Sequence, residues 1–306
     1  MYTYTAYGLG IRSELPLPEL VAAEAPPDIA IRLGEFSHLP PTGSVTGTTP
    51  AGNDFWVKGE DACFFREEVG AFLLKGGREV IVRPAPEVED RVLRLFLWGM
   101  VLSTTLHMRG LLVLHGSAVA VNGGAVGFLG GPGYGKSTTA AMLHSRGHPM
   151  LSDDVLVIDL GGSDGPMVRP AFPQFKLWPE AAEALGEDAE SLPQLHPGMP
   201  KRARLITSGF AQAPVPLDRL FLLDIGESRK IEALRPQEVV MALLSNAYWL
   251  RIFDRPVFGK EANSKHFAQC SELARLVPVR RLSRPRALDE LVDLATFVED
   301  DVAQAV

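Results

Sequence analysis

Cysteine is scarce in this chain of 306 residues, which contains only Cys63 and Cys270. The two residues do not form a Cys-x-x-Cys pair, so the sequence does not suggest a structural zinc site. We expect each cysteine to be a buried thiol, because an unpaired cysteine behaves as a small apolar side chain. So few cysteines are typical of a reducing compartment, and we expect a cytoplasmic protein.

The chain also lacks an excess of positive charge and a long uncharged apolar run. Its net charge is −7 and its pI is about 5.6, which argues against general nucleic-acid binding. The first residues, MYTYTAYGLGIRSELP, have neither the basic start nor the apolar stretch of a secretion signal. The most apolar window, residues 93–114, contains Arg94, His107 and Arg109. It therefore predicts a buried helix followed by a strand, and we expect no membrane partner.

Apolar residues make up 46% of the chain, enough for a sizeable core. Residues 1–86 are predicted to form a small β-rich domain, because short apolar or alternating runs are separated by glycines. The expected strands lie near residues 2–7, 29–33, 54–58, 62–67, 71–74 and 80–83, with a surface loop over 40–52. Residues 87–306 are predicted to form a second, α/β domain that opens with a connecting segment over 87–110. Helical spacing of apolar residues predicts a helix over 87–108 of that segment.

The most informative motif is Gly130-Gly131-Pro132-Gly133-Tyr134-Gly135-Lys136-Ser137, a full match to the phosphate-binding pattern G-x-x-x-x-G-K-S/T. An apolar run over 125–129 predicts a strand before it, and residues 137–146 predict a helix after it. Glycines let backbone N–H groups approach phosphates closely, and the helix N-terminus adds partial positive charge. Lys136 is expected to reach the terminal phosphates of ATP and Ser137 to bind Mg²⁺, with Thr138 next to them. The alternative is a glycine-rich turn without a ligand.

The other predicted elements surround this motif. Residues 111–121 and 125–129 flank Asn122-Gly123, a tight-turn signal, and predict a β-hairpin whose second strand leads into the loop. Further strands are expected at 155–160, 167–169, 220–224 and 277–282. Helices are expected at 179–185, 236–250, 261–276 and 288–297, and residues 187–203 are expected to be loop-like.

A carboxylate pair, Asp153-Asp154, lies between two short apolar runs sixteen residues beyond Ser137. Phosphoryl transfer needs a metal to neutralise charge and a group that orients or deprotonates the acceptor, and two adjacent carboxylates can divide these roles. Two alternatives stay open. Both residues can be solvated turn acids, and Asp224, which also ends an apolar run, can be the metal ligand instead.

Three segments together resemble the catalytic domain of HPr kinase/phosphorylase: HGSAVAV, GGPGYGKST and RGHPMLSDDVLVID, within about residues 112–160. The resemblance implies a core shared with ATP-type phosphoenolpyruvate carboxykinases and phosphorylation of a serine. YGLGIRSELPLPEL, FPQFKLWPEA and a Lys-Arg pair before a strand further resemble the kinases found with lasso-peptide biosynthesis. That branch implies a precursor peptide phosphorylated at its C-terminal serine. The R-G-L-G segment by which HPr kinases bind their substrate is not evident after the Asp pair.

The resemblance also implies roles for single residues. Asp153 corresponds to the family's proton-accepting aspartate, Asp154 to the neighbour that supports the metal, and His115 to a histidine near the acceptor or phosphate. His115 can instead be a packed strand histidine.

Charge stabilisation further needs a cation from outside the loop. Arg202 is the first candidate and Lys201 the next, with Arg204 in the same stretch, where a mobile arm could close; surface solvation is the alternative. Arg251 and Arg255 are reserve candidates. Lys176 and Trp178 are candidates for contact with the peptide or nucleotide, although we expect Trp178 to be packed in the core instead.

Together these features predict an ATP-dependent serine kinase that acts on a peptide, with Asp153, Asp154, His115 and Arg202 as the catalytic residues. The peptide is expected to bind the N-terminal domain or the groove beside it. Three alternatives stay open: an HPr-type kinase/phosphorylase with a protein substrate, a small-molecule enzyme of the carboxykinase type, and a nucleotide-binding scaffold without transfer activity. The resemblance to hexameric HPr kinases also leaves a homo-oligomer possible.

Overall fold

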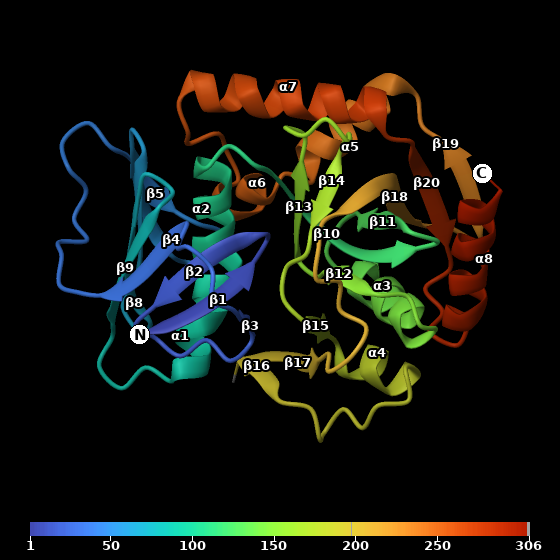
Figure 1. The fold of residues 1–306 in the computed structure, drawn as a ribbon, viewed down its shortest axis with the longest axis horizontal. Helices are drawn as coiled ribbons and strands as arrows, with labels where there is room; N and C mark the ends of the chain where they lie inside the picture. The colour runs from blue at the N-terminus through green and yellow to red at the C-terminus, as the bar shows by residue number, and fades with distance from the viewer. Residues whose placement is uncertain (197, 305–306) are drawn as a thin grey trace. The chain divides into compact units, whose positions relative to one another are not determined.

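The computed structural model describes residues 1–196 and 198–304 and has a mixed α/β fold with three sheets. The chain divides into two compact units (Figure 1). Unit 1 comprises residues 1–113 and 247–268, and unit 2 comprises residues 114–246 and 269–306. Within the described residues, no helix is both long and apolar enough to cross a membrane.

Unit 1 contains a nine-stranded mixed sheet with the order β3-β1-β2-β4-β9-β8-β7-β6-β5. Its strands are β1 (Tyr2–Ala6), β2 (Leu9–Ser13), β3 (Val21–Ala22), β4 (Ile29–Leu33), β5 (Val45–Thr48), β6 (Asp54–Lys58), β7 (Asp61–Arg66), β8 (Gly70–Lys75) and β9 (Glu79–Pro84). All nine strands lie within the region predicted to be β-rich, but three of them, β2, β3 and β5, were not predicted. β5 lies inside the stretch expected to be a loop, and its mostly exposed sequence VTGT has no apolar alternation that would signal a strand.

The helices of unit 1 pack on this sheet. The predicted helix over 87–108 is present as α1 (Asp90–Phe96), the π-helical turn η1 (Leu97–Val101) and α2 (Leu102–Met108). Phe96 stacks on Phe72, and Arg94 forms an ion pair of 2.8 Å with Glu19. These contacts group the helical segment with the N-terminal sheet, which differs from the predicted boundary at residue 86.

A second segment of unit 1 comes from late in the chain. It contains α6 (Tyr248–Phe253) and the beginning of α7 (Lys260–Leu276), a helix that continues into unit 2. The prediction of one helix over 236–250 is wrong, because α5 (Pro236–Ser245) ends before Asn246 and α6 begins at Tyr248. The side chain of Asn246 binds elsewhere in unit 2, as described below.

The main sheet of unit 2 has eight strands, in the order β11-β10-β13-β14-β18-β20-β19 with β12 paired to β10. They are β10 (Leu112–Val121), β11 (Gly124–Leu129), β12 (Met150–Ser152), β13 (Val155–Asp159), β14 (Met167–Arg169), β18 (Val215–Ile225), β19 (Lys230–Ala233) and β20 (Val279–Arg284). β18 runs parallel to both β11 and β20. Because parallel strands end at one edge of a sheet, the carboxyl ends of β11, β18 and β20 lie together.

The predicted hairpin is confirmed. β10 and β11 pair in antiparallel register from Gly116↔Leu129 to Val121↔Gly124. Asn122 and Gly123 between them have φ angles of 51° and 85°, the two positive values that a tight two-residue turn requires.

A three-stranded sheet, β15-β17-β16, completes unit 2. It contains β15 (Gln174–Leu177), β16 (Gln194–His196) and β17 (Met199–Leu205). The prediction of a loop over 187–203 is therefore wrong for most of its second half, while Pro197 lies outside the described residues. β17 has the sequence MPKRARL, and its charged side chains conceal the alternation of a strand.

The helices of unit 2 are α3 (Lys136–Ser145), α4 (Pro179–Ala184), α5, α8 (Leu291–Ala303) and the end of α7. Side chains from α3, α8, β10, β11, β15 and β18 contribute to its buried core, with Phe128, Phe175 and Phe221 among the largest. Cys63 and Cys270 are buried thiols, as expected, and burial raises the pKa of each to about 12.

Candidate functional site

The glycine-rich loop, residues 130–135, connects the end of β11 to the first residue of α3, the strand–loop–helix order predicted from the motif. Gly130, Gly133 and Gly135 have φ angles of 138°, 78° and 83°, which side chains with a Cβ rarely adopt. Lys136 folds back over the loop, and its Nζ donates hydrogen bonds to the carbonyl oxygens of Gly130 (2.7 Å) and Gly131 (3.0 Å). The loop therefore holds its lysine close to its own backbone.

The remaining motif residues surround this lysine. Pro132 and Gly133 are exposed, and Gly131, Tyr134, Gly135 and Ser137 are partly buried. Thr138 is buried in the first turn of α3. The exposed tip and the helix N-terminus leave the backbone of the loop accessible at the end of the strand, where phosphate-binding loops bind anions.

Asp153 follows β12 and is held by two hydrogen bonds. Its Oδ1 accepts from the hydroxyl of Ser117 at 2.7 Å, and its Oδ2 accepts from the backbone N–H of Lys176 at 2.7 Å. The residue is only 3% exposed. Asp153 is thus a fixed, buried carboxylate and not a solvated turn acid; each of its oxygens keeps one acceptor site.

Asp154 has a positive φ of 70°, an uncommon conformation for a residue with a Cβ. Its Oδ2 accepts a hydrogen bond of 2.8 Å from Lys176 Nζ, and its Oδ1 lies 3.3 Å from His115 Nδ1. That same Nδ1 lies 3.0 Å from the backbone carbonyl of Asp154. Because both of these neighbours of Nδ1 are acceptors, we assign a proton of the His115 ring to Nδ1.

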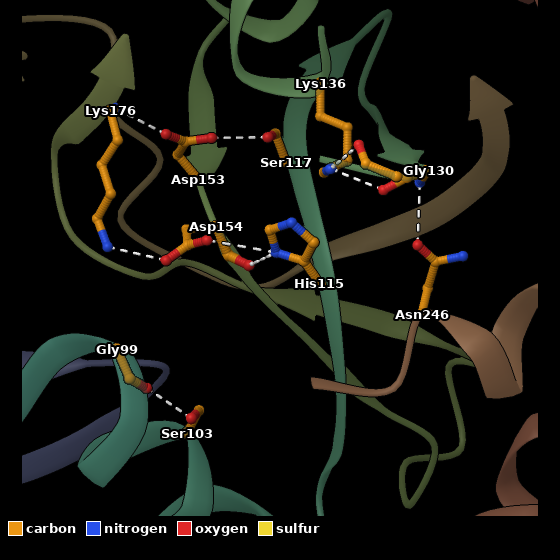
Figure 2. A network of polar contacts seen from close by, with 11 residues as sticks. Gly99, Ser103, His115, Ser117, Gly130, Lys136, Asp153, Asp154, Lys176 and Asn246 are labelled. Atoms are coloured by element: carbon orange, nitrogen blue, oxygen red, sulfur yellow. Dashed lines mark hydrogen bonds and ion pairs between the residues drawn. The ribbon is translucent and has the colours of Figure 1, made fainter. Parts of the chain in front are cut away.

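A residue that the sequence did not indicate, Asn246, joins the carboxylates to the loop. Its Oδ1 accepts from the backbone N–H of Gly130 at 3.0 Å, and its backbone carbonyl accepts from the N–H of His115 at 2.7 Å. Figure 2 shows these residues, with dashed lines that join Lys136 to Gly130, Gly130 to Asn246, and His115 and Lys176 to Asp154. The loop, His115 and both carboxylates therefore belong to one polar network within unit 2.

The chemistry of this network fits magnesium, the ion implied by a phosphate-binding loop. Mg²⁺ takes oxygen ligands and is usually held by one or two protein groups together with phosphate oxygens and water. The hydroxyl of Ser137 and a carboxylate of Asp154 are oxygen donors of this kind. Among the described residues there is no group of three or more His, Cys, Asp and Glu that would enclose a metal by itself.

The predicted cation Arg202 has its ion-pair partner outside this network. It lies on β17, and its guanidinium forms an ion pair of 3.0 Å with Glu190. Arg204, on the same strand, pairs with Glu187 at 2.7 Å. The expected mobile arm is a paired strand, so the loop-based reason for choosing these residues is wrong.

Lys201 lies over the ring of Trp178, with its Nζ 5.5 Å from the ring centroid. The expectation that Trp178 is buried is also wrong, because the residue is 45% exposed. Trp178 follows β15 directly, and β15 also contains Lys176, the residue that contacts both carboxylates.

The reserve candidates have other partners. Arg251 and Arg255 belong to unit 1, where Arg255 donates to the carbonyl of Thr46 and lies over Phe55. Asp224 has a half-exposed side chain whose Oδ1 accepts from the N–H of Ile225.

Sequence reasoning missed three groups that contact the predicted site. Ser117 lies in the HGSAVAV segment, and its hydroxyl donates to Asp153. Asn246, which interrupts a predicted helix, accepts from the backbone N–H of Gly130. Arg284, at the end of β20, donates to the carbonyl of Tyr134 in the glycine-rich loop. None of the three carries a local signal of its contact, since each partner is distant in the sequence.

Comparisons with known proteins add little to this geometry. No protein-family model and no curated protein matches the chain. One similar solved structure is that of the Hpr(Ser) kinase/phosphatase from Coxiella burnetii, at 12% identity and a TM-score of 0.31. The match covers 63% of this chain and 95% of that chain. A similarity at this level assigns neither function nor site residues to this chain.

Proposed function

We propose that this protein is an ATP-dependent serine kinase whose acceptor is a peptide or protein. One observation carries the proposal: a complete glycine-rich loop and a fixed carboxylate pair share one polar network. A phosphate-binding loop by itself accounts only for nucleotide binding. Buried carboxylates tied to the same loop add the group that phosphoryl transfer needs beside the phosphates.

In the proposed reaction, the acceptor serine oxygen attacks the γ-phosphorus of ATP. The new O–P bond forms as the bond between the γ-phosphorus and the bridging oxygen breaks, and ADP leaves. The serine proton passes to a carboxylate oxygen of Asp153, which Ser117 and the N–H of Lys176 hold in position. Lys136 and the backbone of the loop bind the phosphates. Ser137 and Asp154 would hold Mg²⁺, which would neutralise charge on the phosphates when bound.

His115 and Lys176 position Asp154 in this scheme. Both contact its carboxylate, and the His115 backbone is in turn held by Asn246. Positioning of this kind matters because small displacements in an active site cost large factors in rate.

The substrate part of the proposal is narrower and depends on the sequence resemblance. We propose the C-terminal serine of a lasso-peptide precursor as the acceptor. Trp178 supports a peptide substrate, since an exposed aromatic side chain two residues from Lys176 offers a contact for an extended chain close to the carboxylates.

The test is mass spectrometry of a precursor peptide with a terminal serine after incubation with the full chain, ATP and Mg²⁺. We expect one added phosphate at that serine and none with Asp153→Asn. Glu190→Gln is the matched control, since it also neutralises one carboxylate but lies outside the network, and it should retain activity.

Purified HPr serves as a second acceptor in the same assay. Phosphate on HPr but not on the peptide would favour the HPr-type alternative. Tight ATP binding with no phosphate on either acceptor would contradict the proposed acceptors, and full activity of Asp153→Asn would contradict the assigned base.

A further inference from the structure

The buried cation Arg284 lies beside the glycine-rich loop. It is the last residue of β20, at the edge where the parallel strands β11, β18 and β20 end. Its Nη2 donates to the carbonyl of Tyr134 at 3.1 Å, and its Nη1 donates to the carbonyl of Pro285 at 3.0 Å. A Cβ at Gly135 would overlap the same guanidinium. Arg284 therefore lies against the loop backbone immediately before Lys136.

The charge of Arg284 has no counter-ion in the described part of the chain. The residue is 9% exposed, no carboxylate lies within ion-pair distance of it among residues 1–196 and 198–304, and its buried Nε has no hydrogen-bond partner there. Arg281, three residues earlier on β20, faces Asp224 and Glu238 instead. Burial, and then the nearby charge of Arg286, lower the pKa of Arg284. A buried charge without a partner is costly, so an anion bound beside Arg284 would be favourable.

We propose that Arg284 is a second phosphate-binding cation of the loop, and that a phosphoryl group of the bound ligand is the counter-ion it lacks. The inference depends on the proposed nucleotide site and adds a residue that the loop motif does not contain. Two features select a phosphate. The guanidinium presents its donors in a planar fork that matches phosphate oxygens, and the N-terminus of α3 begins at the adjoining residue. Arg284 thus offers a charge that is unpaired among the described residues, whereas Arg202 and Arg204 on β17 are paired with glutamates.

The experiment measures the dissociation constants of ATP, ADP and inorganic pyrophosphate by calorimetry for the full chain, together with the melting temperature without ligand. The variants are Arg284→Met and, as the matched control on the same strand, Arg281→Met. We expect Arg284→Met to weaken ATP binding about 10- to 100-fold, the loss typical of a charge-assisted hydrogen bond. Its melting temperature without ligand should stay equal or rise, because an uncompensated buried charge is removed. Arg281→Met should bind ATP like the wild type.

Unchanged ATP affinity in Arg284→Met would overturn the inference. If that variant does not fold, Arg284→Lys and Arg284→Gln replace it, since both side chains can still donate to Tyr134 and differ in charge. The lysine variant should bind ATP at least about 10-fold more tightly than the glutamine variant; equal affinities would overturn the inference.

The same measurements separate this inference from the proposed function. If the wild type and Arg284→Met bind ATP equally well, the nucleotide site stands and the proposed role of Arg284 is contradicted. Binding of pyrophosphate that depends on Arg284, without binding of ATP, would support the anion site and contradict the kinase. Failure to bind either ligand would contradict both.

Discussion

The ion pair between Lys176 and Asp154 makes a prediction with a definite magnitude. The two charged atoms are 2.8 Å apart, and the side chains are only 10% and 16% exposed. Their Coulomb attraction is about 6 kcal/mol at an effective dielectric constant of about 20. Lys176→Met removes the cation and leaves the carboxylate partly buried. In buried pairs such a change lowers the free energy of unfolding by about 3–5 kcal/mol. We expect the lower end, about 3 kcal/mol, because His115 remains 3.3 Å from the other oxygen of Asp154.

Urea denaturation measures this cost, and hydrogen exchange of peptides from unit 2 assigns it to that unit. Lys176→Met, Asp154→Asn and the double variant form a cycle, which should give a coupling energy of about 2 kcal/mol or more. The hydrogen bond from Lys176 N–H to Asp153 survives the substitution, so ATP affinity should stay within about threefold. A coupling energy within about 0.5 kcal/mol of zero would refute the reasoning, since it would show that the pair is not held in solution.

Three further predictions concern other parts of the molecule. Burial lowers the pKa of His107 to about 3, so below about pH 6.5 the unfolded chain binds a proton that the folded chain does not, and stability falls as the pH falls. Between pH 7 and pH 5 the wild type should therefore lose about 2 kcal/mol more than His107→Phe in urea denaturation, and parallel curves would contradict this. Asn246→Ala should lower the free energy of unfolding by about 1–3 kcal/mol and weaken ATP binding, because the buried N–H of Gly130 loses its acceptor. A melting curve measures the first effect and calorimetry the second. Trp178→Ala should change unfolding by less than about 1 kcal/mol yet raise the KM for the peptide and not for ATP, whereas an equal change in both KM values would exclude a peptide contact.

The predicted elements that the structure confirms carry their signals in neighbouring residues. The hairpin of β10 and β11 follows from Asn122-Gly123 between apolar runs, because these residue types tolerate positive φ. The strand–loop–helix order around residues 125–146 follows from glycine spacing in the same way. β17 was missed because it is paired on both sides by short strands and carries lysine and arginine, so its position depends on pairing and not on its own pattern.

The residues of the candidate site fall into the same two groups, those with a signal in neighbouring residues and those that depend on distant partners. The loop and the Asp pair are contiguous in sequence, so motif and spacing locate them. Their partners are distant: Ser117 lies 36 positions from Asp153, Asn246 lies 116 from Gly130, and Arg284 lies 150 from Tyr134. No local pattern identifies such pairs.

Arg284 shows most clearly why the sequence alone did not draw attention to a buried cation beside the loop. It occurs in RRLSRPR, a basic stretch that resembles a solvated surface, as does the MPKRARL segment of β17. The difference between the two stretches is the location of acidic partners: Arg202 and Arg204 face glutamates, whereas Arg284 ends a parallel strand beside the glycine-rich loop with no carboxylate in ion-pair distance among the described residues. An arginine that is already paired offers little charge to a ligand, and one that is buried without a partner offers all of it. Arg284 is therefore distinguished by its burial without an acidic partner among the described residues, which a count of basic residues along the chain does not reveal.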